Sequence, residues 1–237
     1  GLVGSEMCIR DSFNPGTINE KRALNGLNLK LNEGDFVTVI GGNGAGKSTM
    51  LNAVAGTWPV DEGQILIDNI DVTKLSEHKR ATYLGRVFQD PMTGTAATMG
   101  IEENLALAKR RGKSRLLRSG ITKAEREEYK ELLKILGLGL EDRLTSKVGL
   151  LSGGQRQALT LLMATLQKPK LLLLDEHTAA LDPKTAAKVL EITDMIVNRD
   201  HLTTMMITHN MRDAITHGNR LIMMWEGCLL YTSPAHE

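Results

Sequence analysis

The chain has 237 residues, 24% of them charged, and its 29 Lys and Arg nearly balance its 28 Asp and Glu. This length allows one large domain or two small ones with a sizeable core. The balanced charge argues against a nucleic-acid-binding protein, whose surface is typically basic. No apolar run approaches the length of a membrane span, so we expect any membrane role to be exerted through a partner.

Both ends of the chain resemble translated sequencing adapter. The peptide MCIRD, from residue 7, can be encoded by ATGTGTATAAGAGAC, and CLLYTS, from residue 228, by TGTCTCTTATACACATCT. The reverse complement of the second DNA sequence contains the first, a relation that unrelated native ends would rarely satisfy. We therefore expect residues 1–12 and 228–237 to be non-native, and we set them aside from fold prediction.

Setting these ends aside changes two expectations. Both cysteines, Cys8 and Cys228, lie in them, so the remaining chain has no disulfide framework, which suits a reducing compartment. We also expect the strand that would precede Phe13, and a packing element beyond Gly227, to be missing.

The first half of the chain alternates strand and helix patterns around a glycine-rich segment. Residues 23–31 alternate apolar and polar side chains, and residues 35–40 form a β-branched, apolar run typical of a buried parallel strand. A short helix over residues 50–56 ends at a glycine. Further strands are expected at 64–67, 70–72 and 85–88, and a further short helix at 76–80.

Residues 90–151 differ in character, because helical patterns replace the strands. Apolar spacing predicts helices over 101–109 and 124–136, which we interpret as an inserted helical subdomain. From residue 170 onward, strands and helices alternate again, and the mostly apolar run at 170–174 predicts a fully buried strand. The other elements of this half are helices at 153–166, 184–197 and 211–216 and strands at 203–208 and 220–224. This order predicts a parallel sheet covered by helices on both faces.

The glycine-rich segment is residues 41–49, GGNGAGKST, which match the phosphate-binding loop pattern G-x-x-x-x-G-K-[ST]. A strand precedes it and a helix follows, so backbone N–H groups and the helix N-terminus can converge on phosphate oxygens. Lys47 would reach the β- and γ-phosphates and Ser48 would hold Mg²⁺. A simple glycine-rich turn is the alternative. The expected nucleotide-binding residues are Gly41, Asn43, Gly44, Ala45, Gly46, Lys47, Ser48 and Thr49.

Two carboxylates, Asp175 and Glu176, close the second buried strand. Carboxyl ends of strands in open α/β sheets are where ligands bind. Asp175 would contact the metal, and Glu176 would orient or deprotonate the attacking water. Two solvated carboxylates at a strand end are the alternative.

The segment LSGGQ at 151–155 places Ser152, Gly153, Gly154 and Gln155 at the start of a helix, which makes a second anion-binding N-terminus. One chain has little use for two such sites around one nucleotide. Two chains packed head to tail would each complete the other's phosphate site. A Ser N-cap with a glycine turn is the alternative.

With these motifs the chain resembles the nucleotide-binding subunit of ABC transporters. Its motifs follow that family's order: P-loop, Gln89, LSGGQ, Asp175-Glu176, the Ala-Leu-Asp ending at Asp182, and His209. The resemblance implies an α/β P-loop NTPase (RecA-like) core with a small antiparallel β subdomain and an inserted α-helical subdomain. Residues 13–227 would form a single ABC ATPase domain, with 13–89 and 152–227 as core and β subdomain and 90–151 as helical subdomain.

The resemblance also implies roles for single residues. Gln89 would contact Mg²⁺ or the water and relay the nucleotide state to a permease, and His209 would hold the γ-phosphate. Asp182 would cross the dimer interface, and Phe13 would lie under the adenine ring. Departures from the family pattern are His177, where a proline is usual, and Ala179 or Ala180, where a serine is usual.

By this resemblance the chain would bind ATP and Mg²⁺ and hydrolyse ATP to drive transport. Its partners would be a second copy of itself, an integral membrane permease and, indirectly, an extracytoplasmic substrate-binding protein, with no nucleic acid. It would be peripheral on the cytoplasmic face of the membrane. Residues 84–95 and 101–105 resemble bacterial amino-acid importers of the tryptophan/tyrosine type.

Four alternatives stay open from the sequence. These are a non-transport ABC-type ATPase acting on DNA or ribosomes, an ABC subunit of a different transporter class, a P-loop kinase, and a regulatory cassette without hydrolysis. LSGGQ argues against the kinase, and Glu176 with His209 argues against the regulatory cassette.

Overall fold

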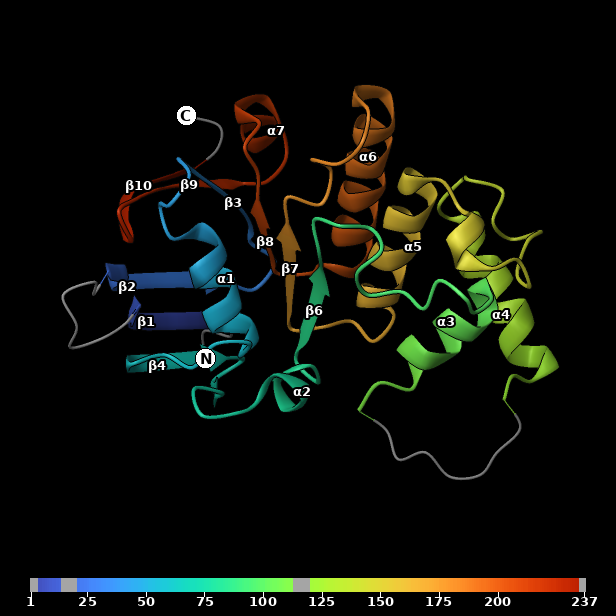
Figure 1. Ribbon diagram of the computed structural model, residues 1–237, viewed down its shortest axis with the longest axis horizontal. Coiled ribbons are helices and arrows are strands. Elements are labelled where there is room, and N and C mark those ends of the chain that lie inside the picture. The colour runs from blue at the N-terminus through green and yellow to red at the C-terminus, as the bar shows by residue number, and fades with distance from the viewer. Residues whose placement is uncertain (1–3, 14–20, 113–119, 235–237) are drawn as a thin grey trace.

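The computed structural model describes residues 4–13, 21–112 and 120–234, which form two sheets and a set of helices (Figure 1). The strands are β1 (Gly4–Phe13), β2 (Lys21–Asn32), β3 (Phe36–Gly41), β4 (Glu62–Ile67), β5 (Ile70–Asp71), β6 (Leu84–Val87), β7 (Leu171–Asp175), β8 (Thr204–Ile207), β9 (Arg220–Trp225) and β10 (Cys228–Pro234). The helices are α1 (Lys47–Ala55), α2 (Glu77–Arg80), α3 (Ile101–Lys109), α4 (Lys123–Lys134), α5 (Gly153–Thr165), α6 (Pro183–Asp200) and α7 (Met211–Thr216), with a 3-10 turn η1 (Val148–Leu150).

The larger sheet has the order β10-β9-β3-β8-β7-β6, and its strands from β9 to β6 run parallel, as the sequence predicts. Ile207 of β8 lies in register with Val39 of β3 on one side and with Asp175 of β7 on the other. The loops that follow these three strands therefore leave the sheet at the same edge. This register brings the glycine-rich loop, Glu176 and His209 together.

The leucine run of β7 is buried because it lies between two hydrophobic cores. Leu172 and Leu174 belong to the core shared with α5 and α6, whereas Leu171 and Leu173 belong to the core shared with α1 and the smaller sheet. Successive strand residues point to opposite faces, so a strand covered on both faces must be apolar throughout. The four leucines thus hold Asp175 at a fixed place at the sheet edge.

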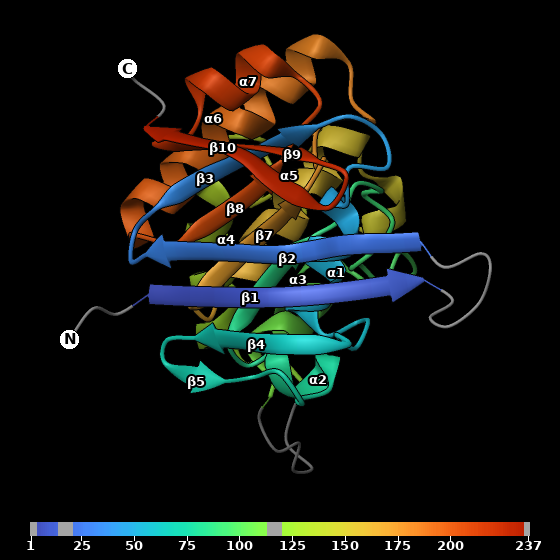
Figure 2. The ribbon, with the colours of Figure 1, turned by 90° about the vertical axis from the view of Figure 1, so that its left-hand side faces the viewer.

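The smaller, antiparallel sheet has the order β2-β1-β4-β5 (Figure 2) and overturns one expectation. We expected no strand before Phe13, but β1 pairs with β2 on one side and β4 on the other. Ser5, Met7 and Ile9 alternate into the core at 1–3% exposure, a spacing that fits the pleat of a strand. The expectation of a missing C-terminal element is likewise wrong, because β10 lies antiparallel to β9.

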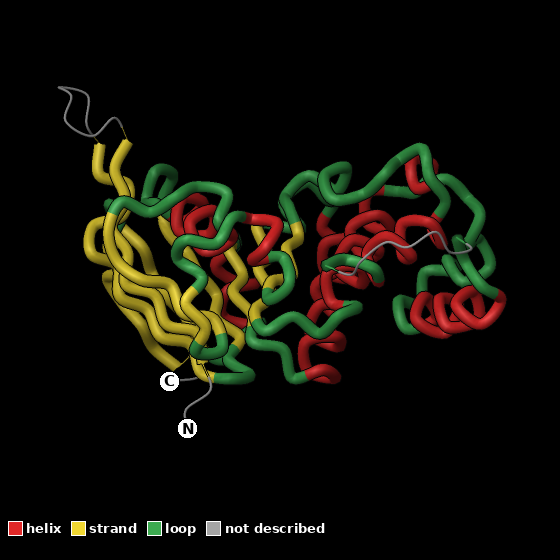
Figure 3. The backbone as a smooth tube through the Cα atoms, turned by 90° about the horizontal axis from the view of Figure 1, so that it is seen from below, coloured by secondary structure: helices red, strands yellow, loops and turns green. Residues whose placement is uncertain are grey.

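Helices α3 and α4 lie beyond α5, on the side of the molecule away from the antiparallel sheet (Figures 1 and 3). Helix α5 contacts β6, α6 and α3, so it connects the parallel sheet to this helical part. Among the described residues, no helix is long and apolar enough to span a bilayer.

Arg80 is a buried arginine that caps the helix following the glycine-rich loop. Its guanidinium donates to the carbonyl oxygens of Ala53 (2.6 Å) and Val54 (2.9 Å) in the last turn of α1, and to those of Thr73 (2.8 Å) and Leu75 (2.9 Å). The side chain is 1% exposed. A cation at this position supplies a charged donor to carbonyl groups at the end of the helix, where the backbone N–H of Gly56 also donates to Ala53.

Replacing Arg80 by Ala should lower the free energy of unfolding by about 3 kcal/mol, because buried carbonyl groups lose a charged donor. Urea titration of the chain measures this change. Replacing the neighbouring, exposed Lys79 by Ala is the matched control and should cost no more than about 0.5 kcal/mol. Equal losses for the two variants would contradict the capping role.

Candidate nucleotide-binding site

The loop between β3 and α1 takes a path that only glycine allows at two positions. Gly41 and Gly46 have φ values of 156° and 95°. A Cβ at Gly41 would lie 2.4 Å from the carbonyl oxygen of Met224, and one at Gly46 would lie 2.6 Å from that of Ala23. The loop is therefore held against β9 and β2, with α1 beginning at Lys47.

A pocket of about 240 Å³ opens over this loop. Its lining consists of Ala23, residues 43–49, Glu176 and His209, which come from loops after β3, β7 and β8 together with β2. The structure thus brings together seven of the eight loop residues that the sequence assigned to phosphate binding, all but Gly41, and three of the four assigned to catalysis, namely Lys47, Glu176 and His209. Ala23 is an addition that its strand pattern did not indicate.

Lys47 lies at the floor of this pocket and is 5% exposed. Its Nζ donates to the carbonyl oxygens of Gly41 (2.8 Å) and Gly42 (3.1 Å). Burial lowers the pKa of Lys47, while the charges of Glu176 and Asp175 oppose this shift. The ammonium group is therefore held inside the curve of its own loop, where a phosphate oxygen would be within its reach.

Glu176 and Asp175 have different surroundings although they are adjacent. Burial raises the pKa of Asp175, and Arg86, whose Nη2 lies 3.8 Å from the Asp175 carboxylate, opposes that shift. Glu176 has a φ of 45°, a left-handed backbone that non-glycine residues seldom adopt and that often occurs at functional sites. One of its carboxylate oxygens lies 2.6 Å from Nε2 of His209. This turn directs Glu176 into the pocket.

Gln89 does not join the pocket. It is exposed in the loop that follows β6, and it is not among the residues lining the pocket. The side chain of Phe13 lies outside the described residues, so its expected stacking on adenine stays a prediction.

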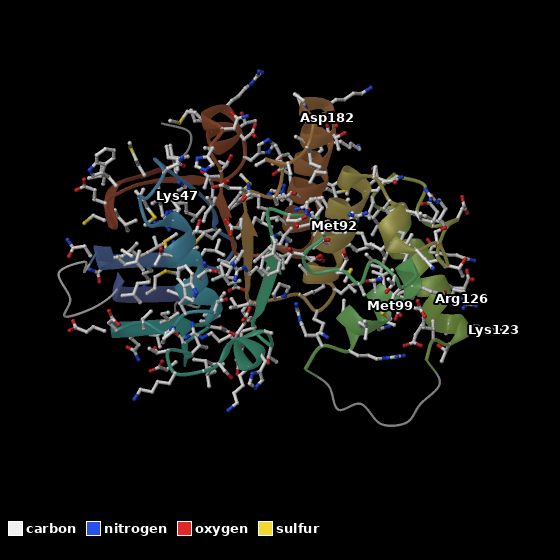
Figure 4. The ribbon with its side chains drawn as sticks, viewed as in Figure 1. Lys47, Met92, Met99, Lys123, Arg126 and Asp182 are labelled. Atoms are coloured by element: carbon white, nitrogen blue, oxygen red, sulfur yellow. The ribbon has the colours of Figure 1, made fainter. Side chains whose placement is uncertain are left out.

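The segment at Ser152 and the residue Asp182 each cap a helix of their own. The hydroxyl of Ser152 accepts from the backbone N–H of Gln155 at 3.2 Å, and Asp182 accepts from that of Thr185 at 3.1 Å. Hydrogen bonds from the side chain and then the backbone of Thr185 lower the pKa of Asp182. Both are exposed, and neither lines the pocket. In Figure 4, Asp182 lies well away from Lys47. Within one chain the LSGGQ serine therefore acts as a helix N-cap.

His177 is buried at 1% exposure beneath α6. Its Nε2 lies 3.1 Å from the hydroxyl of Thr193, which itself donates to the carbonyl oxygen of Val189. Burial, with a smaller effect of His217, lowers the pKa of His177 from 6.5 to about 4. The Nδ1 of His217 in turn lies 2.6 Å from the carboxylate of Asp194.

The pKa of His177 makes the fold sensitive to acid. Between pH 6.5 and 4 the unfolded chain binds a proton here and the folded chain does not, so stability falls as the pH falls through this window. From pH 6.5 to 5 the loss should be about 2 kcal/mol. Urea titrations at both pH values measure it, and His177→Gln should lack this part of the decline. Identical pH slopes for the two proteins would contradict the prediction.

A glycine-rich loop between a central parallel strand and a buried helix, with a lysine and a glutamate facing one pocket, defines a P-loop nucleotide-binding protein. Comparison with known proteins gives the family: the sequence profile described as ABC transporter matches residues 24–179. The chain belongs to the ABC transporter family, and it is an ATPase cassette of that family.

Several relatives are ATP-binding proteins of transport systems. The chain is 46% identical over 213 residues to a tyrosine transport ATP-binding protein of Clostridioides difficile, covering 90% of this chain and 82% of the relative. It is 34% identical over 227 residues to the methionine import ATP-binding protein MetN of Rhizobium johnstonii, covering 91% of this chain and 60% of that protein. It is also 34% identical over 221 residues to the spermidine/putrescine import ATP-binding protein PotA of Haemophilus influenzae, covering 92% of this chain and 54% of that protein. The chain thus spans little more than half the length of the last two.

The fold matches solved ATP-binding cassettes. A dimeric structure of the cassette MJ0796, in a post-hydrolysis state bound to ADP and Pi, superimposes with a TM-score of 0.82 at 29% identity over 98% of this chain and 99% of that one. The expected α/β P-loop fold is therefore confirmed.

Proposed function

We propose that this ATPase drives import of an amino acid as the energising subunit of a membrane transporter. The observation that carries the site assignment is the pocket over the glycine-rich loop, where Lys47, Glu176 and His209 meet. Lys47 and the loop N–H groups bind the phosphates, and Glu176 orients or deprotonates the attacking water. His209, whose Nε2 lies 2.6 Å from the Glu176 carboxylate, would hold both that carboxylate and the γ-phosphate.

The residues present fit a magnesium ion. Ser48 is exposed in the first turn of α1 and lines the pocket, and the Asp175 carboxylate ends β7 nearby. Hydroxyl and carboxylate oxygens are the ligands that Mg²⁺ takes from protein, with substrate phosphates supplying others. When bound, the ion neutralises charge on the phosphoryl oxygens. Ser48 and Asp175 would hold it, and Gln89 would join them only after its loop moves inward.

A second chain completes the site. The segment from Ser152 to Gln155, exposed at Ser152 and Gly153, would contact the nucleotide of a partner copy in a head-to-tail dimer, together with Asp182 just before α6. Leu150, just before this segment, is 72% exposed, as expected of a side chain that a partner covers. The dimeric MJ0796 cassette supports this assembly.

The permease would dock at the groove between β6 and α3. This groove has a volume of about 510 Å³ and is lined by Phe88, Leu107 and Met163 among others. Phe88 immediately precedes Gln89, so an occupant of the groove would act on the loop that carries Gln89. The chain would then be peripheral on the cytoplasmic face of the membrane, with a substrate-binding protein engaging the permease from the other side and with no nucleic acid involved.

The substrate class rests on the relative in Clostridioides difficile, which is named for tyrosine transport. The test is uptake of labelled tyrosine, methionine and spermidine by vesicles that contain this chain with the permease and binding protein encoded beside its gene. ATP-dependent uptake of an amino acid alone is expected. ATP-dependent uptake of the polyamine alone, or ATP hydrolysis without any uptake, would contradict the proposal.

We also propose the domain division expected from the sequence: one ABC ATPase domain over 13–227, with 90–151 as helical subdomain and adapter-derived residues at 1–12 and 228–237. Helices α3 and α4 beyond α5 support the subdomain. Amplifying and sequencing the gene from its source DNA tests the ends. Codons for MCIRD and CLLYTS in the gene would contradict the proposal.

A further inference from the structure

Arg86, on β6, reaches from the groove to the back of the nucleotide site. Its Nη2 donates to the side-chain oxygen of Asn52 in α1 at 2.6 Å and lies 3.8 Å from the carboxylate of Asp175. Its side chain is 14% exposed, so these contacts are largely shielded from water. One guanidinium therefore joins the helix after the glycine-rich loop to the carboxylate at the end of β7.

The other side of the same side chain faces the groove. The guanidinium carbon of Arg86 lies 4.6 Å from the centre of the Phe88 ring, and both residues line the groove. Nη1 of Arg86 donates to the hydroxyl of Thr57 at 3.1 Å. A change in the position of the Phe88 ring would therefore shift the Arg86 guanidinium, which lies beside the Asp175 carboxylate.

Fold stability alone does not account for Arg86. Its Nε is buried and has no hydrogen-bond partner among the described residues. A buried, unpaired N–H group costs stability, and an apolar side chain of similar length would avoid that cost. The place of the positive charge, between Asn52 and the Asp175 carboxylate, therefore explains Arg86 better than a contribution to fold stability does.

We propose that Arg86 is a positioning residue of the nucleotide site. It holds the Asp175 carboxylate at a fixed place relative to α1, and it transmits the position of Phe88 in the groove to that carboxylate. The inference rests on the proposed function, because it gives Asp175 the metal-side role stated there. Arg86 itself does not line the pocket over the glycine-rich loop, so it would act through Asp175.

The test compares Arg86→Met with the wild-type chain, because Met keeps the apolar stem and removes the charged fork. ATP affinity is measured in EDTA and again over a Mg²⁺ titration, and ATP turnover is measured over the same titration. Arg86→Met should leave the affinity in EDTA unchanged. It should raise the Mg²⁺ concentration that gives half-maximal ATP turnover by about 10- to 100-fold, as loss of a group supporting a metal ligand typically does.

Two further variants separate positioning from folding. Arg86→Lys keeps the charge without the planar fork and should give an intermediate Mg²⁺ requirement. Asn52→Ala releases the guanidinium from α1 and should shift the requirement in the same direction. Arg126→Met is the matched control: Arg126 pairs with Glu102 in the helical part (Figure 4), and its loss should leave the Mg²⁺ requirement unchanged.

A wild-type Mg²⁺ requirement in both Arg86→Met and Asn52→Ala would overturn the proposal. So would an equal loss of ATP affinity with and without Mg²⁺, because that would show a structural role only. If wild-type chain binds ATP and Mg²⁺ normally but drives no uptake, the transport function fails while the Arg86 inference stands on the binding data.

Discussion

Replacing Glu176 by Gln should lower ATP turnover by about 10²- to 10⁴-fold, the range expected when a group that orients or deprotonates the water is lost. Gln has the size of Glu but cannot accept a proton. ATP affinity should stay close to that of the wild-type chain, because Lys47 and the loop N–H groups are unchanged. Phosphate release under single-turnover conditions, with ATP affinity measured in parallel, checks both parts.

Glu191→Gln is the matched control for this change, because Glu191 is an exposed carboxylate paired with Lys188 on α6. Its turnover should equal that of the wild-type chain. Wild-type turnover in Glu176→Gln would refute the role of Glu176, and a parallel loss of ATP affinity would show that the left-handed turn at Glu176 had collapsed.

Replacing Lys47 by Ala should weaken ATP binding by about 10- to 100-fold, since charge-assisted hydrogen bonds to the phosphates are lost. Removal of the ammonium also takes one donor from each of the carbonyl groups of Gly41 and Gly42, so the loop should become less ordered. Equilibrium binding of ATP measures the loss. Lys188→Ala, which removes an exposed lysine on α6, should bind ATP as the wild-type chain does. Unchanged affinity in Lys47→Ala would contradict the pocket assignment.

Local patterns of apolar and polar residues predicted most of the helices and strands. The helices expected over 101–109 and 211–216 occur with those bounds as α3 and α7. The helix after the glycine-rich loop begins three residues earlier than expected, at Lys47 rather than at residue 50, because the loop's backbone turns directly into helix. β1 and β10 were not expected because their residues were set aside on coding grounds, although the alternation of Ser5, Met7 and Ile9 is a strand pattern.

The site was predictable where its residues follow one another in the chain or end neighbouring strands. Lys47, Ser48, Glu176 and His209 come together for that reason. Gln89, Ser152 and Asp182 do not line the pocket, and the roles proposed for them need a partner chain or a movement of the loop that carries Gln89. Arg86 has no local pattern that marks it, since its importance arises from contacts with Asn52 and Asp175, which are distant in sequence.

We propose that the pocket over the glycine-rich loop is half of a site completed by a second chain. The most direct test is the mass and bound nucleotide of Glu176→Gln with ATP and Mg²⁺, measured by light scattering and nucleotide assay after gel filtration. We predict a particle of twice the 26.0 kDa of one chain, with one ATP per chain, that returns to monomer when Ser152→Arg is added. A monomer that retains ATP, or a dimer that Ser152→Arg does not dissociate, would contradict a site shared between two chains.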